Sequence, residues 1–164
     1  MAKVVREAGP KASDLEDYQK KIRGGRPGLY YHVKLLGLEM ADPLKLVADV
    51  KKGFLYRALE RFQKNTALST KDLSEVVQIR IRTLIRRKEQ GRLQPDESDR
   101  LLRASRIFGR ALELFEGDVE GARRWLSTPQ AALGGSPPMV VLTTDVGARE
   151  VENLIGRLEH GIPT

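Results

Sequence analysis

The sequence contains no cysteine, which excludes a disulfide framework, thiolate metal sites and cysteine nucleophiles. Histidine is scarce as well, and neither His32 nor His160 stands at metal-ligand spacing from a second ligand. No serine lies in a nucleophile elbow, and the glycine-rich stretch over residues 24–28 is not a phosphate-binding loop. We therefore expect no enzyme activity, no metal and no cofactor. An active site assembled from distant residues is the alternative that stays open.

Long apolar runs and aromatic side chains are also rare. No stretch approaches the roughly 20 apolar residues that span a membrane, and residues 1–28 lack the apolar middle of a signal peptide. Aromatic residues make up only 5% of the 164, so the core must be mostly aliphatic. We expect a soluble protein of the reducing cytoplasm, with no membrane partner.

Positive charge is abundant and unevenly distributed. The net charge of +7 divides into +4 over residues 1–34, +5 over residues 35–103 and −2 over residues 104–164. This asymmetry suggests two surfaces with different partners, and nucleic acid is the natural partner of the basic one. The alternative is a solvated basic face that aids solubility.

A helix-turn-helix pattern lies in the basic part of the chain. Ser69 is a good helix cap, and with Asp72 it approximates a capping box. The core positions of the motif have the expected spacing of 4, 2 and 5 residues, and they are Leu73, Val77, Ile79 and Leu84. Gln78 stands where such turns usually carry glycine, which weakens the prediction of the turn.

The second helix of this motif is strongly basic, since residues 80–92 carry a net charge of +5. In a helix-turn-helix this helix lies in the major groove with its first residues near the base edges. We expect Arg82 and Thr83 to reach bases, and Arg86 and Arg87 to contact phosphates. Arg80 completes the predicted DNA-binding set. The alternative is that these arginines only solvate a helix packed on its neighbours.

Helix start and stop signals surround this motif. Asp42 and Pro43 predict the start of a helix that bends into a second one at Gly53. The apolar residues expected along one side of the first helix are Leu44, Val47 and Val50. Pro95 begins a longer helix whose apolar stripe runs to Phe115. This helix would join the basic part to the last third of the chain without a flexible linker.

The last third reads as a series of short helices. Its capping and breaking positions are, in order, Asp118, Thr128-Pro129, Gly134-Gly135, Ser136-Pro137 and Thr144-Asp145. The final helix has an apolar face made of Val151, Leu154, Ile155 and Leu158. Trp125 is expected in the core of this part.

Four spaced elements in this region stand in a recognisable order. They are Phe115-Glu116-Gly117-Asp118, Trp125-Leu126-x-x-Pro129, Leu133-Gly134-Gly135-x-x-Pro138 and Arg157-x-x-x-Gly161. The pattern resembles the toxin-binding domain shared by the Xre, MbcA and ParS group of bacterial antitoxins. The resemblance covers roughly residues 103–164, with a looser match upstream to about residue 43 that includes the helix-turn-helix.

The resemblance implies an antitoxin of a type II toxin-antitoxin system that binds and neutralises a RES-type toxin that consumes NAD. In this family the chain end is placed to occlude the NAD pocket of the toxin, so Arg157, Glu159, His160 and Ile162 are expected to reach it. The alternative is that Arg157 and His160 only favour the C-terminal end of a helix electrostatically. The resemblance also implies a homodimer that binds paired operator half-sites and represses its own operon.

The predicted fold is all-α, with a helix-turn-helix-containing N-terminal domain followed by a small helical toxin-binding domain. Residues 1–41 are expected to be a variable, partly disordered arm with one short helix near residues 15–22, and residues 29–40 to pack as a short helix or strand. Residues 42–103 would form the Xre-like helix-turn-helix domain and residues 104–164 the toxin-binding domain. The rival function is a helix-turn-helix transcriptional regulator that has no toxin partner.

Overall fold

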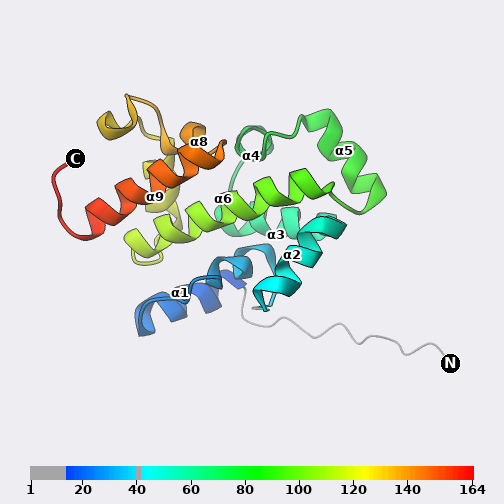
Figure 1. The fold of residues 1–164 in the computed structure, drawn as a ribbon, viewed down its shortest axis with the longest axis horizontal. Coiled ribbons are helices and arrows are strands. Elements are labelled where there is room, and N and C mark those ends of the chain that lie inside the picture. The colour runs from blue at the N-terminus through cyan, green and yellow to red at the C-terminus, as the bar shows by residue number, and fades with distance from the viewer. Residues whose placement is uncertain (1–13, 40–41) are drawn as a thin grey trace.

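A computed structural model describes residues 14–39 and 42–164, and these residues form helices and no β-strand. The predicted all-α class is confirmed. The elements, in which η denotes a 3-10 helix, are α1 (Asp14–Gly24), η1 (Tyr31–Leu36), α2 (Pro43–Lys52), α3 (Tyr56–Thr66), α4 (Thr70–Val77), α5 (Ile81–Gln90), α6 (Pro95–Leu114), α7 (Val119–Ser127), η2 (Ala131–Leu133), α8 (Pro138–Val141) and α9 (Asp145–Glu159). Helix α6 runs through the middle of the molecule, and the other helices pack around it (Figure 1).

Helix α6 begins where the sequence predicts. Pro95 occupies its first turn, and the Glu97 carboxylate accepts a hydrogen bond from the Gln94 backbone N–H at 3.0 Å. The helix contacts η1, α2, α3, α4, α7 and α9. Its buried residues include Leu101, Ile107 and Leu112. One continuous 20-residue helix therefore joins the two halves of the chain.

The N-terminal part differs from the prediction. A helix near residues 15–22 is confirmed by α1, but α1 and η1 fold against α6 and each other. Tyr18 is almost fully buried, and its hydroxyl donates a hydrogen bond to Glu113 on α6 at 3.2 Å. The prediction that this part of the chain belongs to a partly disordered arm is therefore wrong for residues 14–28, whereas η1 gives the helical one of the two alternatives predicted for residues 29–40. Residues 1–13 and 40–41 lie outside the described residues.

Helices α2 and α3 follow their capping signals. The Asp42 carboxylate accepts a hydrogen bond from the Leu44 N–H at 3.1 Å, and Gly53 ends α2 at a φ of 82° that favours glycine. The predicted apolar side of α2 is not a core face, because Leu44 is 76% exposed and Val47 is also exposed. Only Val50 of the three packs against the core.

The C-terminal helices are mostly placed as predicted. Thr144 caps α9 by accepting a hydrogen bond from the Gly147 N–H at 3.0 Å, and Gly134 ends η2 in the left-handed conformation. Two predicted caps are wrong. The Asp118 side chain accepts no hydrogen bond from α7, and the Thr128 hydroxyl donates back to Arg124 instead of starting a new helix. Trp125 is half-buried and packs against Phe115.

Candidate DNA and toxin interfaces

Helices α4 and α5 form the predicted helix-turn-helix. The Ser69 hydroxyl accepts a hydrogen bond from the Asp72 N–H at 3.0 Å, which starts α4. The four core positions at 73, 77, 79 and 84 are all buried. Gln78 adopts the left-handed conformation of the turn, with φ 54° and ψ 43°, and its side-chain amide donates to the Glu75 carbonyl at 2.6 Å. The turn therefore forms without glycine.

Arg100 on helix α6 contacts the backbone of this turn. The Arg100 guanidinium on α6 donates from Nε to the Val77 carbonyl at 2.8 Å and lies within 3.4 Å of the Gln78 carbonyl. These are the carbonyls at the C-terminal end of α4, where a cation is favoured. The helix-turn-helix is thus fixed to the central helix and presents α5 at the right-hand end of the molecule in Figure 1.

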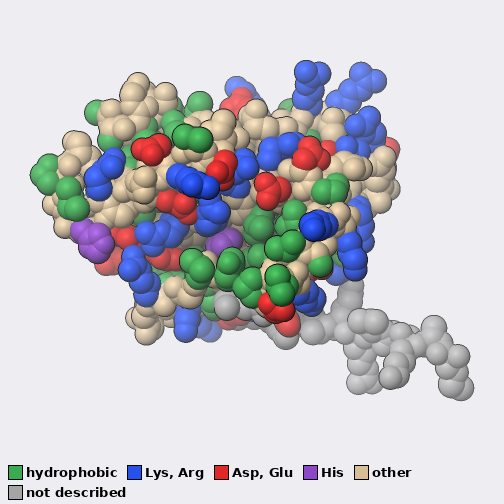
Figure 2. Space-filling view, viewed as in Figure 1, with side chains coloured by type: hydrophobic (Ala, Val, Ile, Leu, Met, Phe, Trp, Pro, Cys, Tyr) green, Lys and Arg blue, Asp and Glu red, His purple; other side chains and the backbone are tan. Residues whose placement is uncertain are grey.

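Three of the predicted DNA-binding arginines are exposed on or next to α5. Arg80, Arg82 and Arg86 are exposed, and their side chains make no hydrogen bond or ion pair within the described part of the chain. Thr83 is half-buried on the same helix. Figure 2 shows Lys and Arg side chains projecting from the right-hand end, where Figure 1 places α5. This end of the molecule can therefore offer free guanidinium groups to an anionic partner.

Arg87 is not available for DNA, which corrects the prediction. Its guanidinium faces α6 and donates from Nε and Nη2 to the Glu97 carboxylate at 2.8–2.9 Å. The two side chains are only 11% and 6% exposed. Burial acts to raise the pKa of Glu97, but the hydrogen bonds from Arg87 and Gln94 outweigh it and hold the pKa below its usual value. This pair joins α5 to α6 and is part of the core.

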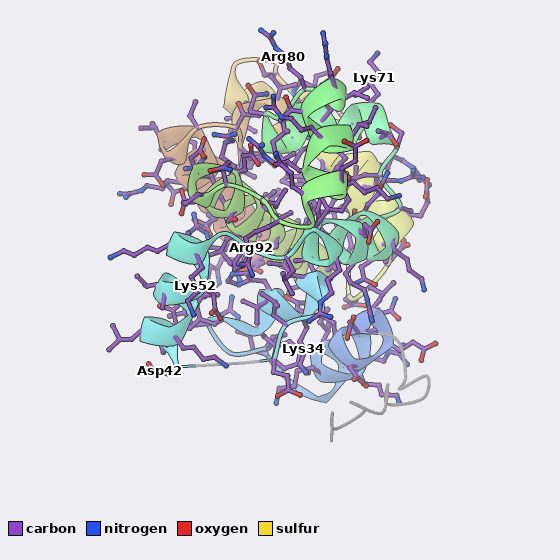
Figure 3. All side chains as sticks on the ribbon, turned by 90° about the vertical axis from the view of Figure 1, so that its right-hand side faces the viewer. Lys34, Asp42, Lys52, Lys71, Arg80 and Arg92 are labelled. Carbon is purple, nitrogen blue, oxygen red and sulfur yellow. The ribbon has the colours of Figure 1, made fainter. Side chains whose placement is uncertain are left out.

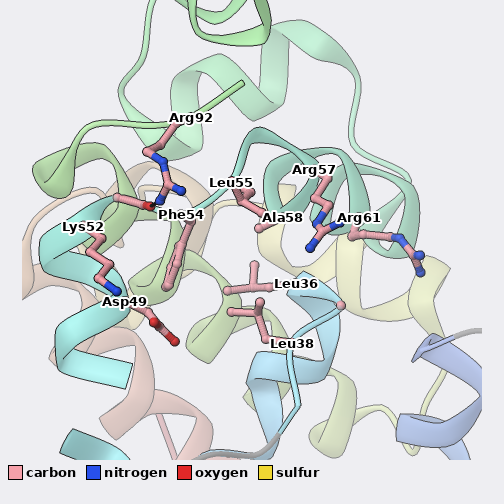
Figure 4. A pocket seen from close by; sticks show the side chains of 12 residues that line it. Leu36, Leu38, Asp49, Lys52, Phe54, Leu55, Arg57, Ala58, Arg61 and Arg92 are labelled. Atoms are coloured by element: carbon pink, nitrogen blue, oxygen red, sulfur yellow. Dashed lines mark hydrogen bonds between the residues drawn. The ribbon is translucent and has the colours of Figure 1, made fainter. Parts of the chain in front are cut away.

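A basic pocket of about 410 Å³ lies below α5, between α2, α3 and the segment after η1. The cations that line it are Lys52, Arg57, Arg61 and Arg92 (Figure 4). Arg92 donates to the Gly53 carbonyl at 2.5 Å, and Arg61 pairs with Asp14 at 2.8 Å, so these two cations already have partners. In Figure 3 Arg92 and Lys52 lie near the middle of the view, and Arg80 lies above them at its upper edge. The sequence did not reveal this pocket, because its lining residues come together only in the fold.

The predicted toxin-binding residues lie in the last turn of α9 and just after it. One of them, Glu159, is already paired with other residues of the chain. The Glu159 carboxylate accepts hydrogen bonds from Arg26 at 2.9 Å and from Arg110 on α6 at 3.1 Å. Because both guanidiniums hold it, Glu159 anchors α9 to α6 and to the segment after α1, and it is not free for a partner. This is a second correction to the predicted site, and the anchoring Arg26 and Arg110 were not predicted.

The residues after Glu159 leave the body of the molecule. His160 and Ile162 are exposed, and Arg157 is half-buried. Gly161 has a φ of 65°, and the Ile162 N–H donates to the Arg157 carbonyl at 2.9 Å, which closes the helix end. The chain end lies at the left of Figure 1, and α5 lies at the right. The two candidate interfaces are therefore at opposite ends of the molecule.

Other kinds of site receive no support from the described residues. Within residues 14–39 and 42–164, no three His, Asp or Glu side chains gather in a way that would hold a metal ion. In the same residues, no helix combines the length and the apolar composition that crossing a bilayer requires.

Both halves of the chain match known protein families. Residues 45–106 match the family described as the antitoxin Xre-like helix-turn-helix domain. Residues 110–161 match the antitoxin Xre/MbcA/ParS C-terminal toxin-binding domain. An antitoxin Xre from Yersinia enterocolitica is 37% identical over 128 residues, which cover 77% of this chain and 86% of that protein. This chain belongs to the Xre antitoxin family.

Two further relatives extend the comparison of this Xre-family protein. An antitoxin Xre from Photorhabdus laumondii is 33% identical over 130 residues, or 79% of this chain and 88% of the relative. A protein from Sphingobium named Prs ADP-ribosylating antitoxin is 26% identical over 159 residues, or 91% of this chain and 98% of the relative. The resemblance that the sequence motifs indicate is confirmed.

Proposed function

We propose that this Xre-family protein is the antitoxin of a type II system that neutralises a RES-type toxin by direct binding and represses its own operon by binding operator DNA. The observation that carries the proposal is the separation of two exposed surfaces by one rigid helix. The toxin-binding segment, residues 110–161, ends at the exposed chain end, while α5 projects from the other end of α6. A toxin and a DNA duplex can then be bound at the same time.

The toxin-binding half of the proposal rests on how α9 ends. The ion pairs of Glu159 fix the direction of this helix, so Arg157, His160 and Ile162 are presented at a defined place. A short protruding end with a cation and an apolar side chain suits a concave enzyme pocket, where few residues supply most of the binding energy. We propose that this end occludes the NAD pocket of the toxin.

The consumption of NAD by the toxin is supported by the name of one relative. ADP-ribosylation transfers the ADP-ribose part of NAD, and the name of the Sphingobium relative, Prs ADP-ribosylating antitoxin, includes this reaction. The relatives from Yersinia and Photorhabdus are both named antitoxin Xre. We propose that the present chain likewise acts by binding and not by catalysis.

The DNA-binding half of the proposal rests on Arg80, Arg82 and Arg86. These exposed cations belong to a helix-turn-helix, a motif whose second helix usually enters the major groove of DNA. Operators read by such motifs are usually paired half-sites, so we propose that the protein binds them as a homodimer.

Co-purification distinguishes an antitoxin from a regulator without a toxin partner. The tagged full chain is co-expressed with its proposed partner, a RES-type enzyme. An antitoxin retains that enzyme in a fixed ratio through size-exclusion chromatography. Recovery of operator DNA without any enzyme would favour the regulator.

The DNA surface is tested by the double variant Arg82→Ala with Arg86→Ala. If both guanidiniums neutralise phosphates, the logarithm of the affinity should fall less steeply with the logarithm of the salt concentration, by about 0.9 for each phosphate that is no longer neutralised. The matched control removes two exposed charges outside the helix-turn-helix, Arg124→Ala on α7 with Arg149→Ala on α9, and should leave the slope unchanged. An unchanged slope in the first variant would place the DNA surface elsewhere.

A further inference from the structure

Two large apolar side chains are exposed on the helix that the proposed function places in DNA. Ile81 is 46% exposed and Ile85 is 58% exposed, whereas their neighbour Leu84 is buried in the core. Single exposed apolar residues are common on protein surfaces. Here, however, two isoleucines stand four residues apart on a ten-residue helix, so they lie on the same face one turn apart.

The surroundings of these isoleucines identify the kind of partner that would cover them. At about 100° per residue, Arg82 lies beside the isoleucines, Arg86 lies farther round the helix, and Thr83 and Arg87 lie toward the opposite, core-facing side. The guanidiniums of Arg82 and Arg86 are exposed and have no ion-pair partner among the described residues. An apolar protein partner would bury or crowd these free charges, whereas a phosphate backbone would neutralise them.

The major groove of DNA offers this combination of chemistry. Phosphates line its edges, and the 5-methyl group of thymine is the one apolar feature that its floor presents. An isoleucine on the face of a helix that is turned toward the floor of the groove can cover such a methyl group and exclude water from it. The arginines alongside it can then hold the backbone or a guanine edge.

We propose that Ile81 and Ile85 are specificity-determining residues that read thymine methyl groups in the operator. This inference rests on the proposed DNA-binding function and adds the base type that the site recognises. Four residues of helix rise about 6 Å, which corresponds to about two base-pair steps of 3.4 Å. The half-site should therefore contain thymines at two positions that α5 covers, about two steps apart.

Thymine-to-uracil exchange tests this inference directly. The probe is a duplex of the promoter region upstream of the gene for this chain, in which single thymines are replaced by deoxyuridine, which lacks only the methyl group. The full chain should lose affinity about fourfold at one or two of these positions, the amount expected for one buried methyl group. Exchange at the other thymines should have no effect.

The same duplexes are then measured with Ile81→Ala and Ile85→Ala. Each variant should bind the unmodified duplex more weakly than the full chain does. At the position that its isoleucine reads, replacing thymine by uracil should cause no further loss of affinity. Because both side chains are exposed, the variants should keep the thermal stability of the full chain. The matched control is Val146→Ala, which removes a similarly exposed apolar side chain from α9 and should leave the uracil sensitivity unchanged.

The outcomes separate this inference from the proposed function. DNA binding without any uracil sensitivity, or with equal sensitivity in the isoleucine variants, would overturn the reading of thymine and leave DNA binding intact. Loss of toxin binding in Ile81→Ala or Ile85→Ala would show that the patch docks a protein instead. No binding of the chain to promoter DNA would overturn both proposals.

Discussion

Arg86 and Arg87 are neighbours in the sequence but have opposite surroundings. Arg86 is exposed on the outer face of α5, and Arg87 is buried in its bidentate pair with Glu97. A helix turns by about 100° at each residue, so adjacent positions in a basic run face different environments. The identity of the side chain therefore does not reveal its role, which depends on what the neighbouring helix places opposite it.

This difference predicts contrasting effects of two matched substitutions. Arg87→Met leaves Glu97 buried without its partner and should lower the free energy of unfolding by about 3 kcal/mol. Arg86→Met should change it by less than about 0.5 kcal/mol and should weaken DNA binding instead. Urea unfolding of both variants checks the prediction. Equal stability of the two would show that the buried pair does not hold α5 on α6.

His32 gives the protein a pH dependence in the mildly acidic range. It is buried between η1 and α6, and burial, with a smaller contribution from Arg106, lowers its pKa to about 4. The unfolded chain, with a histidine pKa near 6.5, binds the proton more readily. The stability that neutral His32 contributes is therefore complete above about pH 6.5 and is lost as the pH falls toward 4.

Protonation of His32 should consequently lower the free energy of unfolding by about 2 kcal/mol between pH 7 and pH 5. His32→Gln should remove that part of the pH dependence, and the exposed His160→Gln is the matched control. Urea unfolding at the two pH values measures it. An identical pH dependence in His32→Gln and the full chain would contradict the prediction.

At the scale of elements, the turn between α4 and α5 depends on a residue in an uncommon conformation. Gln78 is left-handed, with a φ of 54°, and its side chain returns to the Glu75 carbonyl. Glycine is the usual solution at such a position, and β-branched residues tolerate it least. The local hydrogen bond and the Arg100 contacts help to hold glutamine there.

Gln78→Val should therefore destabilise the protein by about 1 kcal/mol or more relative to Gln78→Gly. Both variants lose the side-chain hydrogen bond, so the comparison isolates the conformational strain. Thermal unfolding measures the difference, and operator binding should fall with it because the turn orients α5. If the two variants were equally stable, strain at position 78 would not matter.

Local signals predicted the elements well, because they act within a few residues. The caps at Asp42, Ser69 and Thr144 and the stop at Gly134 form hydrogen bonds or turns with near neighbours. Asp118 has the same side-chain chemistry but makes no capping bond in the folded chain. The sequence signal gives the position of a helix end more reliably than the bond that satisfies it.

At the scale of the whole molecule, the sequence could not show which distant residues meet. Tyr18 bonds to Glu113, which is 95 positions away, and Arg26 bonds to Glu159, which is 133 positions away. These contacts fold residues 14–39 onto the body, and they remove Glu159 from the candidate toxin surface. His160 and Ile162 were predicted as toxin contacts because the family motif ends beside them; both are exposed, and their contact with a toxin stays a prediction.

Helix α6 gives the molecule its functional geometry. It carries Arg100, which holds the helix-turn-helix, and Arg110, which holds the end of α9. The two matched segments, residues 45–106 and 110–161, therefore share one continuous helix instead of a linker. We infer that toxin and operator are held at a fixed distance and orientation.

The most direct test of the account is the growth of cells that express the proposed RES-type toxin together with this chain shortened to end at Glu159. This shortened chain lacks His160 and the residues after it, but it keeps α9 and the Glu159 ion pairs, so its thermal stability and DNA binding should be nearly unchanged. The account predicts that the full chain restores growth and that the shortened chain does not. Equal protection by the shortened chain would contradict the proposal that the chain end occludes the toxin.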